Sequence, residues 1–277
     1  MRKSSLDEKP TDIDQYTAWL RNEFSIEGQA VLRNRFEFAT SRILLDLQSS
    51  LMWRAILAEL REWDDEYFIK TEYRLFSTSD PPELVRKGFE SFYLKTFRRN
   101  ILENERWPEE PEGGWITPSD WFSRINDVIR TIFVVKYLDG VTFLSEKMRG
   151  LCEKNEIPCR VDFEAREEGY YAAHLYMTQL VEIPKPDWDT ERVPLSVEFQ
   201  ITTQLQDVIV RLTHEQYERR RVRIDPPSMK WQWDYESEEF IPNYLGHILH
   251  YLEGMIMEVR THGRADGRAG GSGGVQT

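Results

Sequence analysis

A strand in the second half of the chain carries an acidic residue on the face opposite to its apolar side chains. In the segment VEFQITT, which begins at Val197, apolar and polar residues alternate, so Glu198 and Gln200 share one face of the predicted strand. A carboxylate at such a position is costly unless solvent, a cation or a metal ion receives it. Glu198 is therefore the first candidate for a residue that carries out chemistry.

Asp127 is the second acidic candidate, because it stands where a loop is expected to enter a strand, in the segment INDVI that begins at Ile125. Two carboxylates at one edge of a sheet are a common set of oxygen ligands for Mg²⁺ beside a phosphate. Asp127 and Glu198 are thus candidate catalytic residues and candidate metal ligands. The alternative interpretation is that Asp127 caps a turn and Glu198 faces solvent, and spacing alone favours neither.

Basic residues are concentrated in the segment that precedes Asp127. With one serine, this cluster comprises Arg86, Lys87, Ser91, Lys95, Arg98 and Arg99. The intervals from Lys87 through Ser91 and Lys95 to Arg98 are four, four and three residues, which predicts one face of a helix. Several cations on one face without an acid repel each other unless an anion such as a triphosphate binds there. The alternative is a solvated face that forms salt bridges with the acidic remainder of the chain.

A glycine followed by a tyrosine marks a third candidate site. Gly169 can supply a turn that exposes one side of the Tyr170 ring, and an exposed ring at the start of a strand can stack on a nucleobase. The alternative is a tyrosine in the core. His174 lies an even number of positions from Tyr170 and is expected on the same face, and His214 is predicted on the helix after the Glu198 strand.

The apolar periodicity predicts an α/β core wrapped by helices at its N-terminal side. Helices are expected over 12–20, 29–63, 66–76, 83–105, 138–153, 204–221 and 238–260, and strands over 127–137, 157–163, 171–183 and 193–202. The final helix carries apolar residues on one face, and its two histidines, His247 and His250, are interpreted as packing residues. We divide the chain into a flexible N-terminus (1–10), a helical region (11–80), a core (83–221), an aromatic connector with the last helix (222–262) and a disordered tail (263–277).

The composition of the chain argues against several classes of protein. The formal charge of -12 argues against a protein that coats nucleic acid through bulk positive charge. The two cysteines, Cys152 and Cys159, are too few for a disulfide framework and lack the companions of a zinc site. No signal peptide and no run of about 18 apolar residues is found, so we expect no membrane partner and a cytoplasmic location.

Residues 83–220 resemble the synthetase domain of the RelA/SpoT family. The resemblance rests on segments in the same order with similar gaps: Lys87–Ser91 with Lys95 and Arg98–Arg99, Ile125–Ile129, Gly169–Tyr170 with His174, Val197–Ile201 and Leu212–His214. Flanking segments at 107–108, 114–116, 134–140 and 243–248 are similar to single-domain small alarmone synthetases, in particular to their toxic subset. The His-Asp metal motif of the family's hydrolase half is absent.

The resemblance implies a nucleotidyltransferase-like α/β fold with a mixed, mostly antiparallel sheet of about five strands flanked by helices. It also implies that the protein transfers the β,γ-pyrophosphate of ATP to a ribose 3′-hydroxyl, with Mg²⁺ held by Asp127 and Glu198. The implied ATP-binding residues are Arg86, Lys87, Ser91, Lys95, Arg98, Arg99 and Arg130. The implied acceptor-binding residues are Arg166, Gly169, Tyr170, His174, Gln200 and His214.

The sequence is compatible with two acceptors of the pyrophosphate. GDP or GTP would give an alarmone, whereas the 3′ end of tRNA would give a toxin that blocks translation and that an antitoxin protein neutralises. We place the guanine nucleotide first, on the breadth of the family.

The chain departs from the family pattern at Val85, Ile132 and Thr202, where the family has arginines. Their replacement motivates the hypothesis of a non-catalytic module that binds nucleotides or partners. A further alternative is nucleotidyl transfer, which releases pyrophosphate rather than AMP.

Overall fold

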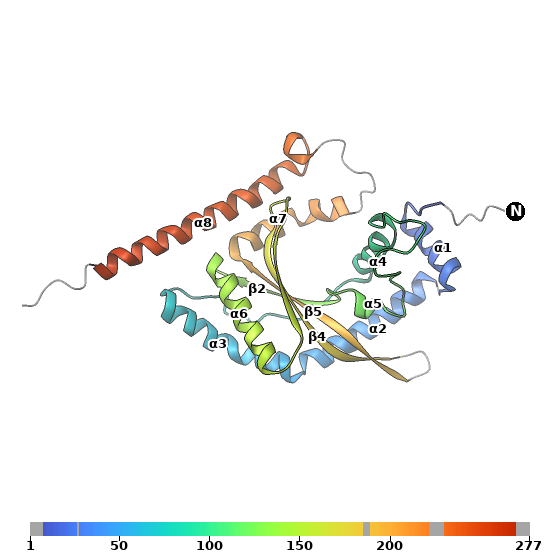
Figure 1. The fold of residues 1–277 in the computed structure, drawn as a ribbon, viewed down its shortest axis with the longest axis horizontal. Coiled ribbons are helices and arrows are strands. Elements are labelled where there is room, and N and C mark those ends of the chain that lie inside the picture. The colour runs from blue at the N-terminus through green and yellow to red at the C-terminus, as the bar shows by residue number, and fades with distance from the viewer. Residues whose placement is uncertain (1–7, 27, 185–188, 222–229, 270–277) are drawn as a thin grey trace, which may run out of the picture.

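The computed structural model describes residues 8–26, 28–184, 189–221 and 230–269, without the side chains of 184, 214–221 and 263–269. Its centre is a five-stranded sheet in the order β1-β2-β5-β4-β3 (Figure 1). The strands are β1 (Val85–Arg86), β2 (Ile129–Val135), β3 (Cys159–Ala165), β4 (Tyr171–Pro184) and β5 (Thr190–Thr203). Only the β2–β5 pair is parallel, so the predicted mixed, mostly antiparallel sheet of five strands is confirmed.

Helices surround this sheet. They are α1 (Ile13–Phe24), α2 (Gln29–Gln48), α3 (Leu51–Thr71), α4 (Phe89–Phe97), α5 (Trp121–Arg124), α6 (Leu138–Lys154), α7 (Gln204–Arg221) and α8 (Phe240–Ala269). A π-helical turn (Arg98–Leu102) continues α4, and a 3₁₀ turn (Trp231–Trp233) precedes α8. In Figure 1, α2 and α3 lie along one side of the molecule and α8 lies on the other, beside α7. None of the helices in the described part of the chain combines the length and hydrophobicity needed to cross a bilayer.

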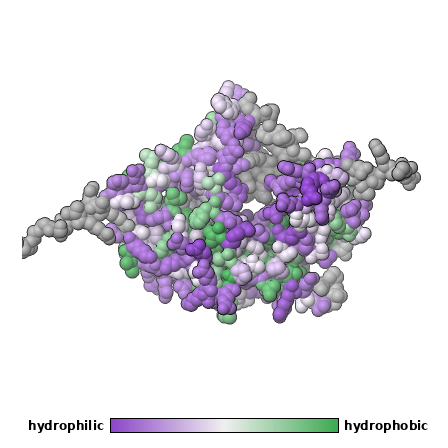
Figure 2. All heavy atoms as spheres, in the orientation of Figure 1, coloured by the Kyte–Doolittle hydropathy of each residue, from purple (hydrophilic) through white to green (hydrophobic). Residues whose placement is uncertain are grey.

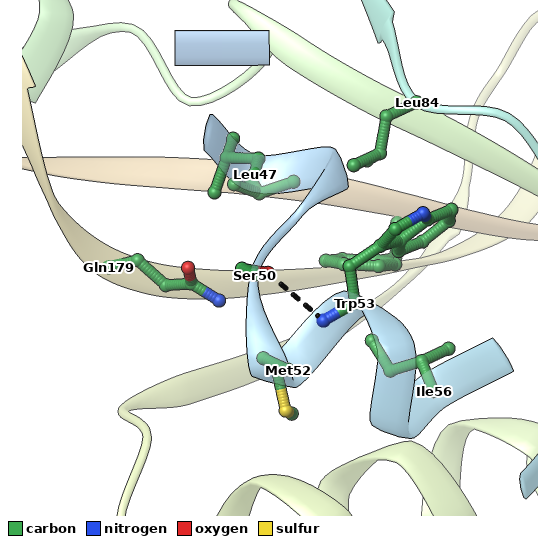
Figure 3. Close-up of a pocket in the computed structure, with 9 residues that line it drawn as sticks. Leu47, Ser50, Met52, Trp53, Ile56, Leu84 and Gln179 are labelled. Atoms are coloured by element: carbon green, nitrogen blue, oxygen red, sulfur yellow. Dashed lines mark hydrogen bonds between the residues drawn. The ribbon is translucent and has the colours of Figure 1, made fainter. Parts of the chain in front are cut away.

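Local sequence explains where the N-terminal helices begin. The carboxylate of Asp12 accepts a hydrogen bond from the backbone N–H of Gln15 at 2.8 Å, which confirms Asp12 as the N-cap of α1. Ser50 caps α3 in the same way, through its hydroxyl and the backbone N–H of Trp53 (Figure 3). These caps set the residues at which α1 and α3 begin.

The sheet has an apolar face and an open, polar face. The apolar face packs on α2 and α3 and contributes Val197 and Phe199 to a small pocket. The other lining residues are Leu47, Ser50, Met52, Trp53, Ile56, Leu84 and Gln179 (Figure 3). Because side chains alternate along a strand, Glu198 lies on the opposite face of β5 from this pocket. The apolar pocket is therefore part of the core and not the site of chemistry.

The predicted helix 29–63 is divided in the structure, because α2 ends at Gln48 and Ser50 caps the start of α3. Three other predicted elements also differ from the structure. The predicted helix 66–76 does not exist as a separate element, because α3 runs unbroken to Thr71 and Phe76 then bridges to Val135 of β2. The predicted helix 83–105 begins only at Phe89, because Val85 and Arg86 pair with the edge of β2. The last helix continues to Ala269, so residues 263–269 of the predicted disordered tail are helical, and residues 270–277 lie outside the described residues.

Helix α8 turns its polar side toward the body of the protein. The apolar face predicted from the sequence is exposed apart from the half-buried Phe240, and its other side chains are Tyr244, Ile248, Leu252, Met255 and Val259. The buried positions are instead Asn243, Gly246 and Glu253. Periodicity showed correctly that the helix has two different faces, but tertiary contacts at the loop before β4 determine which face is buried.

Glu253 gives this arrangement a measurable dependence on pH. Only 4% of its surface is exposed, and burial raises the pKa of its carboxyl to about 7, an effect that a polar contact with Thr203 offsets only in part. In the unfolded chain the pKa is about 4.3. As pH rises between these two values, the unfolded state loses the proton first, so the folded state loses stability.

We therefore expect Glu253→Gln to raise the free energy of unfolding more at pH 8 than at pH 5. The gain at pH 8 should exceed the gain at pH 5 by about 2 kcal/mol. Urea unfolding of both proteins at the two pH values measures this difference. Glu258→Gln, at an exposed position on the same helix, is the matched control and should show no such gain. An equal gain at both pH values for Glu253→Gln would contradict the assignment.

Candidate active site

Glu198 lies at the centre of a polar cluster on the open face of the sheet. Only 5% of its surface is exposed. Its Oε1 accepts hydrogen bonds from His174 Nδ1 at 2.9 Å and from the Tyr176 hydroxyl at 3.3 Å, and its Oε2 accepts one from Gln200 Nε2 at 3.0 Å. The carboxylate is thus surrounded by hydrogen-bond donors rather than by apolar packing, which offsets the cost of its burial.

A chain of hydrogen bonds links Glu198 to Tyr170 through His174. A carboxylate oxygen accepts hydrogen bonds, so His174 donates to Glu198 from Nδ1. In the neutral imidazole, Nε2 is then an acceptor, and the hydroxyl of Tyr170 donates to it at 3.0 Å. Tyr170 and His174, which sequence spacing placed on one face, therefore lie in direct contact and share the face of Glu198.

The register of β4 and β5 brings these side chains together. Tyr176 is paired with Glu198 and His174 with Gln200 across the antiparallel pair. Tyr176 was not among the predicted site residues, although it lies two positions after His174 and must share its face. Burial, together with the negative charges of Glu198 and Glu164, raises the pKa of the Tyr176 hydroxyl well above its usual value, so this group remains a donor.

Asp127 forms a second cluster with two lysines. Lys87 Nζ lies 2.8 Å from its Oδ2, and Lys95 Nζ lies 2.9 Å from its Oδ1. Burial alone would raise the pKa of the Asp127 carboxyl, but the charges of Lys95 and Lys87 and their hydrogen bonds outweigh it and hold this pKa well below the usual range. Asp127 is therefore ionised at every pH at which the protein would be studied.

This cluster carries an excess of positive charge. Lys87 is only 5% exposed and is positioned by a backbone hydrogen bond from its N–H to the carbonyl of Val128. Burial and the like charges of Lys87 and Arg99 lower the pKa of Lys95, against the opposing effect of Asp127. Two ammonium groups on one carboxylate leave a net positive site, which favours a bound polyanion such as a triphosphate.

The remaining predicted ATP-binding residues lie around the lysines in different settings. Arg86 is exposed on β1, and Ser91 is half-buried on α4. Arg98 forms an ion pair with Glu103 at 2.8 Å, and Arg99 donates to the backbone carbonyl of Arg124 at 3.1 Å. The predicted single helical face is wrong for Lys87, which precedes α4 because β1 and the Gly88 N-cap occupy that part of the predicted helix.

The register of the sheet places Arg130 next to Glu198. It pairs with Glu198 in the parallel β2–β5 ladder, and it is the third residue after Asp127. In the described part of the chain, no hydrogen bond or ion pair joins Asp127 directly to Glu198. Seen as filled atoms, the surface is hollowed between the α4 and α7 regions, above β5, and its surroundings are mainly hydrophilic (Figure 2).

The two clusters offer one carboxylate each as oxygen donors for a magnesium ion. Among the described residues no group of three or more acidic, histidine or cysteine side chains could hold a metal on its own. Mg²⁺ commonly takes only one or two carboxylates and completes its shell with water and substrate phosphates. Asp127, which is held ionised beside two lysines, and Glu198 are the residues that would hold it.

Of the predicted acceptor-binding residues, Arg166, Gly169 and Tyr170 lie in the loop between β3 and β4, His174 lies on β4 and Gln200 lies on β5. Gly169 has a φ of +78°, and its N–H donates to the Arg166 carbonyl at 2.9 Å, which closes a tight turn. The guanidinium of Arg166 lies 5.0 Å from the Tyr170 ring centroid and 2.5 Å from Glu164. The side chain of His214, on α7, lies outside the described residues.

Comparison with solved structures identifies the fold. Small alarmone synthetase 1 from Bacillus subtilis bound to its product pppGpp matches with a TM-score of 0.52 and 13% sequence identity, over 83% of this chain and 96% of that one. The chain has the fold of a small alarmone synthetase. The same enzyme bound to AMPCPP matches with a TM-score of 0.50 and 13% identity, over 84% of this chain and 97% of that one.

At this level of identity the small alarmone synthetase fold is shown by the course of the backbone, not by the sequence. No protein-family model matches the chain. No curated protein sequence matches it either. The roles of individual residues within the small alarmone synthetase fold therefore rest on the two polar clusters described above.

Proposed function

We propose that the protein is a pyrophosphotransferase that moves the β,γ-pyrophosphate of ATP to the ribose 3′-hydroxyl of GDP or GTP. The observation that carries this proposal is the pair of polar clusters, an anion site made by Lys87, Lys95 and Asp127 and a buried Glu198 carboxylate surrounded by hydrogen-bond donors. Structures with this fold hold AMPCPP, an ATP analogue, and pppGpp, which supports a nucleotide donor and a guanine acceptor.

The donor end of the site acts through charge. Lys87 and Lys95 contact the triphosphate of ATP, and Arg130 neutralises charge near the bond that breaks, a role supported by its pairing with Glu198 in the sheet. A magnesium ion held by Asp127 and Glu198 would supply further charge neutralisation on the phosphates. Positioning and charge neutralisation are the main sources of rate acceleration in phosphoryl transfer.

The acceptor end of the site acts through orientation and proton transfer. Tyr170 stacks on the acceptor base, and its hydrogen bond to His174 fixes the ring relative to Glu198. Glu198 takes the proton of the 3′-hydroxyl as its oxygen attacks the β-phosphorus. The bond between the β-phosphorus and the oxygen shared with the α-phosphate breaks, and AMP leaves with that oxygen.

The acceptor is tested by offering the purified protein γ-labelled ATP with equal amounts of GDP, GTP and deacylated tRNA. We expect label on the guanine nucleotide, with AMP formed in equal amount. Label on tRNA would contradict the proposed acceptor and assign the protein to the translation-blocking alternative. Binding of ATP without AMP formation with any of the three would indicate a non-catalytic binding module and would contradict the proposal.

A further inference from the structure

Helix α8 makes backbone contact with the loop that carries Tyr170. A Cβ atom added at Gly246 would lie 2.4 Å from the carbonyl oxygen of Gly169, and one added at Gly169 would lie 2.5 Å from the carbonyl oxygen of Asn243. Real Cβ atoms do not approach backbone that closely. The two glycines therefore let α8 and the loop pack directly against each other (Figure 1).

His247, the next residue of α8, bridges both ends of that loop. Its Nε2 lies 2.9 Å from the carbonyl oxygen of Glu167, and its Nδ1 lies 2.8 Å from the hydroxyl of Tyr171. A carbonyl can only accept, so Nε2 carries the proton and Nδ1 of the neutral ring accepts from Tyr171. The residues that His247 holds lie on either side of Tyr170, one before and one after the turn.

A second set of contacts holds His247 and the loop from outside. The Trp231 ring stacks on the His247 ring, with centroids 6.1 Å apart and planes inclined by 12°. The neighbouring Gln232 donates to the Glu167 carboxylate at 2.7 Å. From the other side, Gln206 of α7 donates to the carbonyl of Gly246 at 3.2 Å. The loop therefore contacts both α8 and the 3₁₀ turn Trp231–Trp233.

We propose that His247 is a positioning residue for the acceptor nucleotide. It holds the backbone carbonyl of Glu167 before Tyr170 and the side chain of Tyr171 after it, and Tyr170 is linked through His174 to Glu198. The place of the acceptor base relative to Glu198 then depends on α8. Of the lysines that hold Asp127, Lys87 follows β1 and Lys95 lies on α4, and neither contacts α8 among the described ion pairs. This inference rests on the proposed function, because it gives α8 control of the acceptor and not of ATP.

The test compares His247→Ala, His247→Gln and Ile248→Ala with the wild-type protein, with GTP as acceptor. Ile248 is the matched control, since it is the next residue of α8 and is 58% exposed. We expect His247→Ala to raise the KM for GTP at least tenfold while the KM for ATP changes less than twofold. His247→Gln should recover part of the loss, because its amide can donate to the Glu167 carbonyl. Ile248→Ala should match the wild type.

Amide hydrogen exchange of residues 166–171 provides a readout independent of activity, and we expect faster exchange in His247→Ala. If the wild-type protein transfers pyrophosphate and His247→Ala has an unchanged KM for GTP, the positioning role is overturned and the proposed function stands. An equal rise in the KM for GTP and the KM for ATP would also overturn the positioning role, because the substitution would then not act on the acceptor in particular. If the wild type itself transfers pyrophosphate to no acceptor, the proposed function fails, and the role assigned to His247 fails with it whatever the exchange rates show.

Discussion

Glu198→Gln is expected to reduce the rate of AMP formation by about 10³-fold, the loss typical for removal of a general base. Glutamine keeps the size of the side chain but cannot take the proton of the 3′-hydroxyl or carry the negative charge that His174, Tyr176 and Gln200 surround. The measurement is the rate of AMP release with ATP and GTP at saturation, with the thermal unfolding temperature as a check on folding.

Glu182→Gln is the matched control for this experiment. Glu182 is an exposed carboxylate on β4 that pairs with Arg192 at 3.1 Å, away from the polar cluster. It should retain the wild-type rate. A folded Glu198→Gln protein with wild-type activity would show that Glu198 has a structural role only.

The second large effect concerns the ion cluster of Asp127. Asp127→Asn should abolish transfer and should also lower the free energy of unfolding by roughly 3 kcal/mol, because two ammonium groups, one of them buried, lose their counter-charge. A domain of this size has a stability of about 5–15 kcal/mol, so the variant is expected to remain folded at 25 °C with a lower Tm. Urea unfolding and ATP-dependent AMP release measure the two losses.

A double-mutant cycle separates the interaction energy between Lys87 and Asp127 from the effect of losing each side chain alone. Lys87→Met alone leaves Asp127 with one lysine, whereas the combination of Lys87→Met with Asp127→Asn removes both members of the buried pair. We expect the double variant to be more stable than the sum of the two single losses predicts, by at least about 1 kcal/mol. Strict additivity would mean that the Lys87–Asp127 contact contributes no net interaction energy.

Strand alternation predicted the open face of the sheet well. It placed Glu198 and Gln200 together from the VEFQITT pattern, and it placed His174 with Tyr170, because a period of two decides which side chains share a face. The same rule would have identified Tyr176. The contacts between Glu198 and His174 depended in addition on the register of β4 with β5, which the single sequence did not determine.

Other features depended on contacts between distant parts of the chain. Lys87 was predicted on a helix, yet a two-residue strand places it beside Asp127, 40 positions later in the sequence. So short a strand leaves no periodic signal. The sequence also did not predict that the apolar side of α8 faces outward. An amphipathic pattern shows that a helix has two faces but not which of them packs on the body of the protein.

The fate of each phosphate of ATP tests the central claim most directly. Parallel reactions with α-, β- and γ-labelled ATP and GTP as acceptor should leave the α label in AMP and transfer the β and γ labels together to the guanine nucleotide. Label from the α-phosphate on the acceptor, with free pyrophosphate, would indicate nucleotidyl transfer. Transfer of the γ label alone, with ADP as product, would indicate a simple kinase. Either of these results would contradict the account.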